Sequence, residues 1–192
     1  MVSWITARWL ALTESVILLA LVMISWTWFQ PSLEETSTLA FGWVAQIWLR
    51  NMVLLVLVAG GLHWFFFMKK KQGNRLKFDP RDLMYKGKQF SFGGQVRDNM
   101  FWSLVSGVGF WTAYEVLMFW AMGNGYAPIM NPSSNPVLFV LWFLLTPLWI
   151  SFHFYWVHRL LHWGPIYGWF HALHHRNINV GPWSGLSMHP VE

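Results

Sequence analysis

The sequence has 192 residues, of which 55% are hydrophobic and only 11% are charged, and its formal net charge is +5. A typical soluble domain has roughly 25% charged residues, so this composition excludes an ordinary soluble protein and indicates an integral membrane protein. The chain has no cysteine, which excludes disulfides, thiolate ligands and iron–sulfur clusters, and any metal must be bound through nitrogen or oxygen.

Four apolar stretches are long enough to cross a bilayer as helices, which takes about 20 residues each. They cover about residues 9–29, 41–68, 99–122 and 137–157. The first stretch has no small-residue cleavage site before Gln30-Pro31, so we interpret it as a retained anchor rather than a signal peptide. The sequence therefore predicts an all-α fold, a multi-span membrane helical bundle over residues 1–150.

Positive charge is concentrated between the second and third stretches. Nine of the 13 lysines and arginines lie within residues 69–97. The only charged residues of the first loop are Glu34 and Glu35, and residues 123–136 carry no charge. Under the positive-inside rule, the basic loop and both termini are cytoplasmic. A nucleic-acid or lipid-headgroup patch is the alternative, but the basic cluster directly follows an apolar span, so we expect no nucleic-acid partner. We expect a multi-pass protein of a bacterial inner membrane, with the endoplasmic reticulum as the alternative.

Arg50, His63 and Glu115 are ionisable residues that lie in apolar surroundings within these stretches. An ionisable group is costly within a bilayer and is a functional candidate by default. A role at the membrane interface or in pairing helices is the alternative, which we favour for each of them.

Seven of the eight histidines lie between residues 153 and 192. Five of them form two groups, His158-x-x-x-His162 and His171-x-x-His174-His175. Residues three and four apart share one face of a helix, so each group presents its imidazoles together. Neutral imidazole binds iron, copper and zinc. Hydrogen-bonded structural histidines would not explain two such groups, and the sequence therefore predicts a polyhistidine metal site.

The kind of metal follows from the number and type of ligands. A structural zinc site needs four ligands and usually includes cysteine. A zinc protease motif would place glutamate directly after the first histidine, where this chain has Arg159. Ligands in this number fit two metal ions, and two irons can activate dioxygen for attack on an unactivated C–H bond.

The residues around these histidines carry a family resemblance. Residues 154–162, 170–175 and the His189-Pro190-Val191-Glu192 element resemble the fatty acid hydroxylase superfamily, also called the sterol desaturase family. The resemblance implies a membrane-bound non-haem di-iron oxygenase that hydroxylates or desaturates a lipid such as a sterol or fatty acyl chain. It also implies dioxygen and an external electron donor as partners.

The resemblance assigns the site residues by position. His158 and His162 match the first histidine box, and His171, His174 and His175 match the second, which makes all five iron ligands. His189 matches the H-P-x-E element, which implies a ligand or a neighbour of a ligand. Residues 151–192 would then be the N-terminal part of the histidine-box domain, and we expect Arg159 to pair with a carboxylate.

One element of the family pattern does not occur in these 192 residues. The third histidine box, which would follow two further hydrophobic segments, is absent, so we expect an incomplete chain that is inactive alone. The alternative function is a non-catalytic membrane metal-binding protein, either a transporter or a haem-binding electron carrier. Crowded histidines fit paired axial haem ligands poorly, and few ionisable residues line the spans.

Overall fold

A computed structural model describes residues 16–192 except 76, 78, 85 and 131. Within these residues the protein is all-helical, which confirms the predicted fold class. Three continuous helices are long and apolar enough to cross a membrane: Phe41–Met68, Gln95–Gly123 and Pro136–Leu161. They coincide with the second, third and fourth predicted stretches. The predicted first span begins outside the described residues, and its described part contains a shorter apolar helix, Val16–Trp28.

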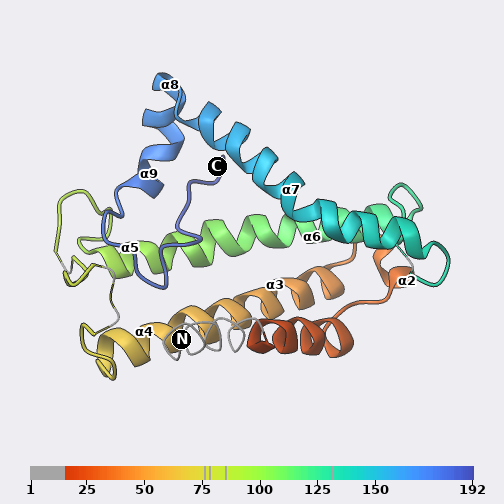
Figure 1. Cartoon of the computed structure of the whole chain (residues 1–192), viewed down its shortest axis with the longest axis horizontal. Helices are drawn as coiled ribbons and strands as arrows, with labels where there is room; N and C mark the ends of the chain where they lie inside the picture. Colours follow the sequence, from red (N-terminus) through yellow and green to blue (C-terminus); the bar gives the residue numbers. More distant parts are fainter. Residues whose placement is uncertain (1–15, 76, 78, 85, 131) are drawn as a thin grey trace, which may run out of the picture.

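The first two long helices contain π-helical turns as well as α-helical segments. The α-helical segments are labelled in Figure 1. The first long helix consists of α3 (Phe41–Leu55), a π-helical turn (Val56–Gly60), α4 (Gly61–His63) and a second π-helical turn (Trp64–Met68). The second consists of α5 (Gln95–Trp102), a π-helical turn (Ser103–Gly107) and α6 (Val108–Gly123). The remaining elements are α2 (Leu33–Thr36), α7 (Pro136–Leu161), α8 (Gly164–Ile166), a π-helical turn (Tyr167–His171) and α9 (Ala172–His175).

Local sequence signals account for where these helices begin. Ser32 and Glu35 form a reciprocal capping box at α2, in which the Glu35 amide donates to the Ser32 hydroxyl at 3.2 Å. At α7, Asn135 caps the helix by accepting from the Leu138 amide at 3.0 Å, and Pro136 occupies the first turn. Proline is tolerated there because its missing N–H would have no helical partner.

The α3 and α6 helices pack side by side and form the centre of the bundle (Figure 1). Trp43, Ile47 and Phe119 form a buried apolar cluster between them. The short α2 helix closes over the end of α6, where a Cβ on Gly123 would lie only 2.7 Å from the Leu33 carbonyl oxygen. Glycine is therefore required at this close approach.

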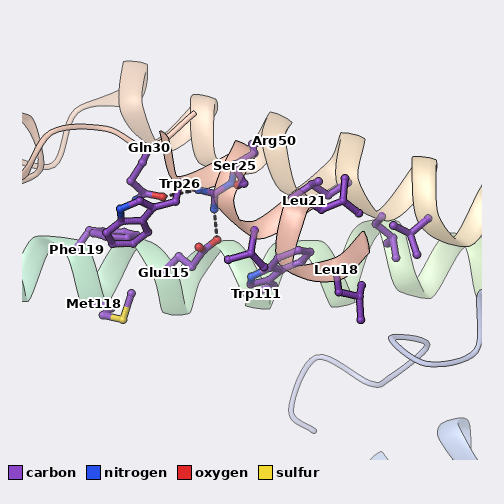
Figure 2. Close-up of a pocket in the computed structure, with 14 residues that line it drawn as sticks. Leu18, Leu21, Ser25, Trp26, Gln30, Arg50, Trp111, Glu115, Met118 and Phe119 are labelled. Carbon is purple, nitrogen blue, oxygen red and sulfur yellow. Dashed lines mark hydrogen bonds and ion pairs between the residues drawn. The ribbon is translucent and has the colours of Figure 1, made fainter. Parts of the chain in front are cut away.

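A polar network crosses the α3–α6 interface, as shown in Figure 2. Arg50 pairs with Glu115 at 2.5 Å, and Asn51 donates to the same carboxylate at 2.6 Å. Arg50 also donates to the Gln30 side chain at 2.7 Å. Gln30, Arg50 and Glu115 line one part of a largely apolar cavity of about 410 Å³. Arg50 and Glu115 thus pair two helices, which is the role that we favoured for them.

The α7 helix is the least covered of the long helices. None of its residues is buried, and it leans away from α6 on its way to α8 (Figure 1). Pro147 lies within it and removes one backbone donor. The hydroxyl of Thr146 donates to the Trp142 carbonyl at 2.7 Å, and that of Ser151 to the Pro147 carbonyl at 2.9 Å. The helix remains continuous past the proline to Leu161.

Candidate metal centre

The two histidine groups lie on consecutive helices that face each other. His158 and His162 occupy the last turn of α7 and the residue after it, so both lie on the same helix face. Gly164 and Pro165 then start α8 and turn the chain back. The second group begins at the end of the π-helical turn Tyr167–His171 and continues through α9. Such wide turns are frequent at functional sites.

Four of the predicted ligands meet at the point where α7 and α9 approach. Each of these four side chains offers a nitrogen, and these atoms lie within 4.8 Å of one another: His158, His162, His171 and His175. The closest approaches join Nε2 of His158 to Nε2 of His162 at 3.1 Å, and Nε2 of His171 to Nε2 of His175 at 2.8 Å. Both pairs have the i, i+4 spacing seen in the sequence.

This arrangement fits a metal ion. Ligand nitrogens around one ion lie roughly 3.0–3.4 Å apart when metal–nitrogen bonds are about 2.1 Å long. The His158–His162 pair, at 3.1 Å, falls in that range, and the His171–His175 pair, at 2.8 Å, lies just below it. Burial and neighbouring imidazoles lower the pKa of His175 and bring that of His171 down to about 4. Both rings are therefore neutral near pH 7, which is the form that binds metal.

His171 is the most enclosed of the four ligands and has an acidic partner. Its side chain is fully buried, and its Nδ1 lies 2.6 Å from Oε1 of Glu192, whose side chain is 6% exposed. Burial raises the pKa of the Glu192 carboxyl to about 7. Sequence reasoning did not single out Glu192 as a site residue, although the H-P-x-E element contains it.

The other predicted ligands lie around this group rather than in it. The His174 ring stacks on that of His171 at 5.8 Å, and its Nδ1 is buried without a partner among the described residues. The His189 ring contacts Phe170, with centroids 5.0 Å apart. His153 lies one turn before the first box and contacts Trp149.

An ion pair that sequence reasoning missed fixes α9 to α5. Arg176, which directly follows His175, pairs with the fully buried carboxylate of Asp98. Asp98 also accepts from the Ser91 amide at 2.8 Å, and Arg176 donates to the Gln89 carbonyl at 3.1 Å. The only signal in the sequence was an acidic residue near the start of an otherwise apolar span.

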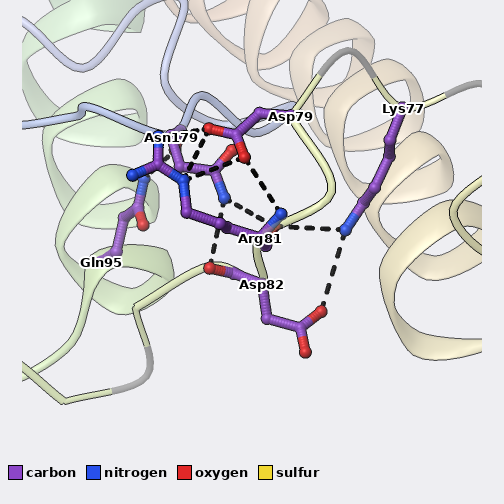
Figure 3. Close-up of polar contacts among 6 residues, drawn as sticks. All are labelled: Lys77, Asp79, Arg81, Asp82, Gln95 and Asn179. Atoms are coloured by element: carbon purple, nitrogen blue, oxygen red, sulfur yellow. Dashed lines mark hydrogen bonds and ion pairs between the residues drawn. The ribbon is translucent and has the colours of Figure 1, made fainter.

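The basic loop between the first two long helices lies at the same end of the molecule as the histidines. The side-chain amide of Asn179 donates to the Arg81 carbonyl at 2.7 Å and to the Asp82 carbonyl at 3.2 Å (Figure 3). Gln95 in turn donates to the Asn179 carbonyl at 2.5 Å. These contacts bring the loop and the segment that follows the second histidine group together at one end of the molecule.

The segment after Arg176 runs back along α5 and the π-helical turn that follows it (Figure 1). The buried hydroxyl of Ser103 donates to the Trp183 carbonyl at 2.6 Å, and Ser187 donates to the Asn99 side chain at 3.0 Å. A Cβ on Gly107 would lie 2.7 Å from the Leu186 carbonyl oxygen. These contacts fix the course of the segment that leads to Glu192.

Arg159 does not have the partner that we expected. Its guanidinium donates to the Tyr155 hydroxyl at 2.6 Å, one turn earlier on α7, and not to a carboxylate. Among the described residues, Arg176 is the arginine beside the histidines that forms an ion pair with a buried carboxylate, that of Asp98.

Comparison with known proteins agrees with this geometry. No curated protein and no solved structure matches the chain. The family model described as fatty acid hydroxylase matches residues 143–192, which include every histidine of both groups. The resemblance inferred from the histidine motifs is thus confirmed over residues 143–192, the part of the chain that matches the fatty acid hydroxylase family.

Proposed function

We propose that this chain carries the first part of the iron site of a membrane-bound, O2-dependent lipid hydroxylase or desaturase. The family domain indicates a lipid hydroxylase- or desaturase-like role and oxidoreductase activity in general. The observation that supports the finer proposal most directly is the convergence of four histidine nitrogens within 4.8 Å. The cysteine-free donor set suits iron, and two ions are expected from the family.

In this proposal, the side chains of the protein bind the iron and orient it. His158, His162, His171 and His175 would hold iron, with His174 and His189 as lower-ranked candidates. Bound iron would supply dioxygen activation with electrons from an external donor. The His162 and His175 side chains are exposed, so the histidine group is accessible from one side.

The position of the site along α7 supports a lipid substrate. His158 lies 22 residues after Pro136, which corresponds to about 33 Å along a helix axis at roughly 1.5 Å per residue. A hydrocarbon core is about 30 Å thick. A helix that starts at one boundary therefore brings the first histidine pair to the other, where an acyl chain or sterol approaches and a soluble donor can dock.

Iron content tests the metal assignment. We would express the full chain, reconstitute it in nanodiscs and measure iron per chain for the wild type and for alanine variants of His158, His162, His171 and His175. We expect each of the four substitutions to remove most of the iron. His153→Ala is the matched control, because this histidine lies on α7 outside the group, and it should bind iron as the wild type does.

Two further measurements test the chemistry. A Soret absorbance band in the purified protein would contradict the proposal and favour the haem-binding alternative. Full iron retention in all four alanine variants would also contradict the proposal. Mass spectrometry of lipids from expressing cells tests the reaction. We expect lipids that have gained one oxygen atom or lost two hydrogen atoms in cells that supply dioxygen, an electron donor and the third histidine box.

A further inference from the structure

Glu192 lies against the ligand that is most deeply buried. Its Oε1 is 2.6 Å from Nδ1 of His171, and these side chains are 6% and 0% exposed, respectively. In the described part of the chain, His171 is the side chain that forms a hydrogen bond with this carboxylate, and the second carboxylate oxygen is buried without a partner. Among the side chains, the carboxylate therefore acts on the His171 ring.

The other nitrogen of the same ring faces the histidine group. Nε2 of His171 lies 2.8 Å from Nε2 of His175, and the ring centroids of His158 and His162 lie 4.5 Å and 4.7 Å from that of His171. A neutral imidazole carries one N–H and one lone pair. If the proton is on Nδ1 and this N–H donates a hydrogen bond to Glu192, the lone pair is on Nε2, which points toward the other three histidines.

The backbone around Glu192 is held by contacts outside the group of four converging histidines. Ser187 is fully buried and donates to Asn99 at 3.0 Å. The Glu192 amide donates to the His189 carbonyl at 2.9 Å, and the Val191 amide to Nδ1 of His189 at 3.2 Å, so this last segment forms a turn. The carboxylate is thus brought to His171 by contacts with α5.

From this geometry we propose that Glu192 is a positioning residue that fixes the tautomer and the ring orientation of His171, so that Nε2 is presented to the metal. This inference rests on the proposed metal site. Carboxylates that hold a ligand imidazole by its second nitrogen raise the basicity of the ligand, and their removal typically lowers metal affinity about 10- to 100-fold.

The test combines a measurement without metal with one that uses Co²⁺ as a spectroscopic probe. The full chain, labelled with ¹⁵N-histidine, is placed in nanodiscs at mildly alkaline pH, and the imidazole nitrogen shifts of His171 are identified by comparison with His171→Asn. Glu192→Ala removes the acceptor. Glu192→Gln preserves side-chain volume and serves if the alanine variant does not fold. Glu34→Gln, on the exposed surface of α2, is the matched control.

We expect His171 to carry its proton on Nδ1 in the wild type and in the Glu34 control. In Glu192→Ala, this preference should be lost and Co²⁺ affinity should fall about 10- to 100-fold, with Glu192→Gln between the two. An unchanged His171 tautomer in both Glu192 variants would overturn the inference.

The two proposals fail in different ways. If the Glu192 variants bind Co²⁺ as tightly as the wild type while His171→Ala does not bind it, the positioning role is wrong and the metal site remains. If the wild type binds no Co²⁺ but its His171 tautomer depends on Glu192, the positioning contact is real and the proposed metal function is wrong.

Discussion

Arg50 and Glu115 form an ion pair of 2.5 Å between α3 and α6, with only 6% and 21% of their side chains exposed. Breaking a buried pair by removing one partner typically costs about 3–5 kcal/mol because the other charge stays behind. We expect that cost for Glu115→Leu, measured as unfolding free energy in detergent. The double variant Arg50→Met/Glu115→Leu should recover most of it.

The exposed ion pair between Arg81 and Asp79 is the control for this prediction. It has the same length, 2.5 Å, but the Arg81 side chain is 68% exposed. Arg81→Gln should leave the unfolding transition unchanged, since solvent screens exposed pairs. If the double variant at positions 50 and 115 is as unstable as Glu115→Leu, the pair has a role other than mutual neutralisation.

Gly107 and Gly109 give a matched pair of substitutions on one helix. A Cβ at Gly107 would lie 2.7 Å from the Leu186 carbonyl oxygen and 2.8 Å from its Cβ, whereas a Cβ at Gly109 meets nothing within 4 Å. Gly107→Ala should lower the unfolding free energy by about 1–3 kcal/mol through overpacking, and Gly109→Ala should not. Equal melting temperatures for the two variants would show that the 177–192 segment does not pack here.

The pair between Asp98 and Arg176 should affect both stability and the metal site. Asp98 is fully buried, and Arg176 directly follows His175, which we propose as a metal ligand. We expect Asp98→Asn to destabilise the protein by about 3–5 kcal/mol and to weaken Co²⁺ binding, because α9 loses its attachment to α5. Thermal unfolding and Co²⁺ titration in nanodiscs measure the two effects.

Asp82→Asn is the control for Asp98→Asn. Asp82 pairs with Lys77 at 3.8 Å, and its side chain is 66% exposed, so the substitution should change neither quantity. Weaker stability with normal Co²⁺ affinity in Asp98→Asn would mean that α9 keeps its position without this ion pair.

Acid should destabilise the metal-free protein through His171. The pKa of this ring falls from 6.5 to about 4 on folding, mainly because of burial. Above pH 6.5 the His171 ring is neutral in both the folded and the unfolded protein, so its contribution to the free energy of unfolding is fully present. As the pH falls from 6.5 to 4, the unfolded chain takes up the proton first and stability is lost. His171→Asn should therefore show a shallower decrease in melting temperature across this range.

Glu192 has the opposite pH dependence. The pKa of its carboxyl rises from 4.5 to about 7, so its contribution to stability is complete in acid and is lost as the pH rises between these values. A Glu192→Gln variant separates the two effects. It should no longer lose stability as the pH rises from 4.5 to about 7, but it should still lose stability in acid through His171. Identical pH profiles for the wild type and both variants would contradict the assignment.

The long helices and the first histidine pair could be predicted because they depend on local patterns. Span length comes from runs of apolar residues, and the i, i+4 spacing places His158 and His162 on one face of α7. The positions of Asp98, Ser103 and Glu192 could not be predicted. Their roles depend on contacts over 78, 80 and 21 residues of sequence, and one sequence gives no measure of such pairing.

The division of the histidines also required the structure. The spacing of the second group allows His171, His174 and His175 to share a face, but the π-helical turn that ends at His171 changes the local geometry. His171 and His175 face the first pair, whereas the His174 ring stacks outside it.

The anchoring of the 177–192 segment on α5 has a consequence for the order of folding. Ser103 and Trp183 are 80 residues apart in the chain, yet their hydrogen bond fixes the path that brings Glu192 to His171. Such non-local contacts form after local ones because a long loop must close first. During synthesis, the first histidine pair is therefore placed by its own helix, α7. The proposed metal centre is completed only when the later 177–192 segment has packed against α5, which was synthesised much earlier.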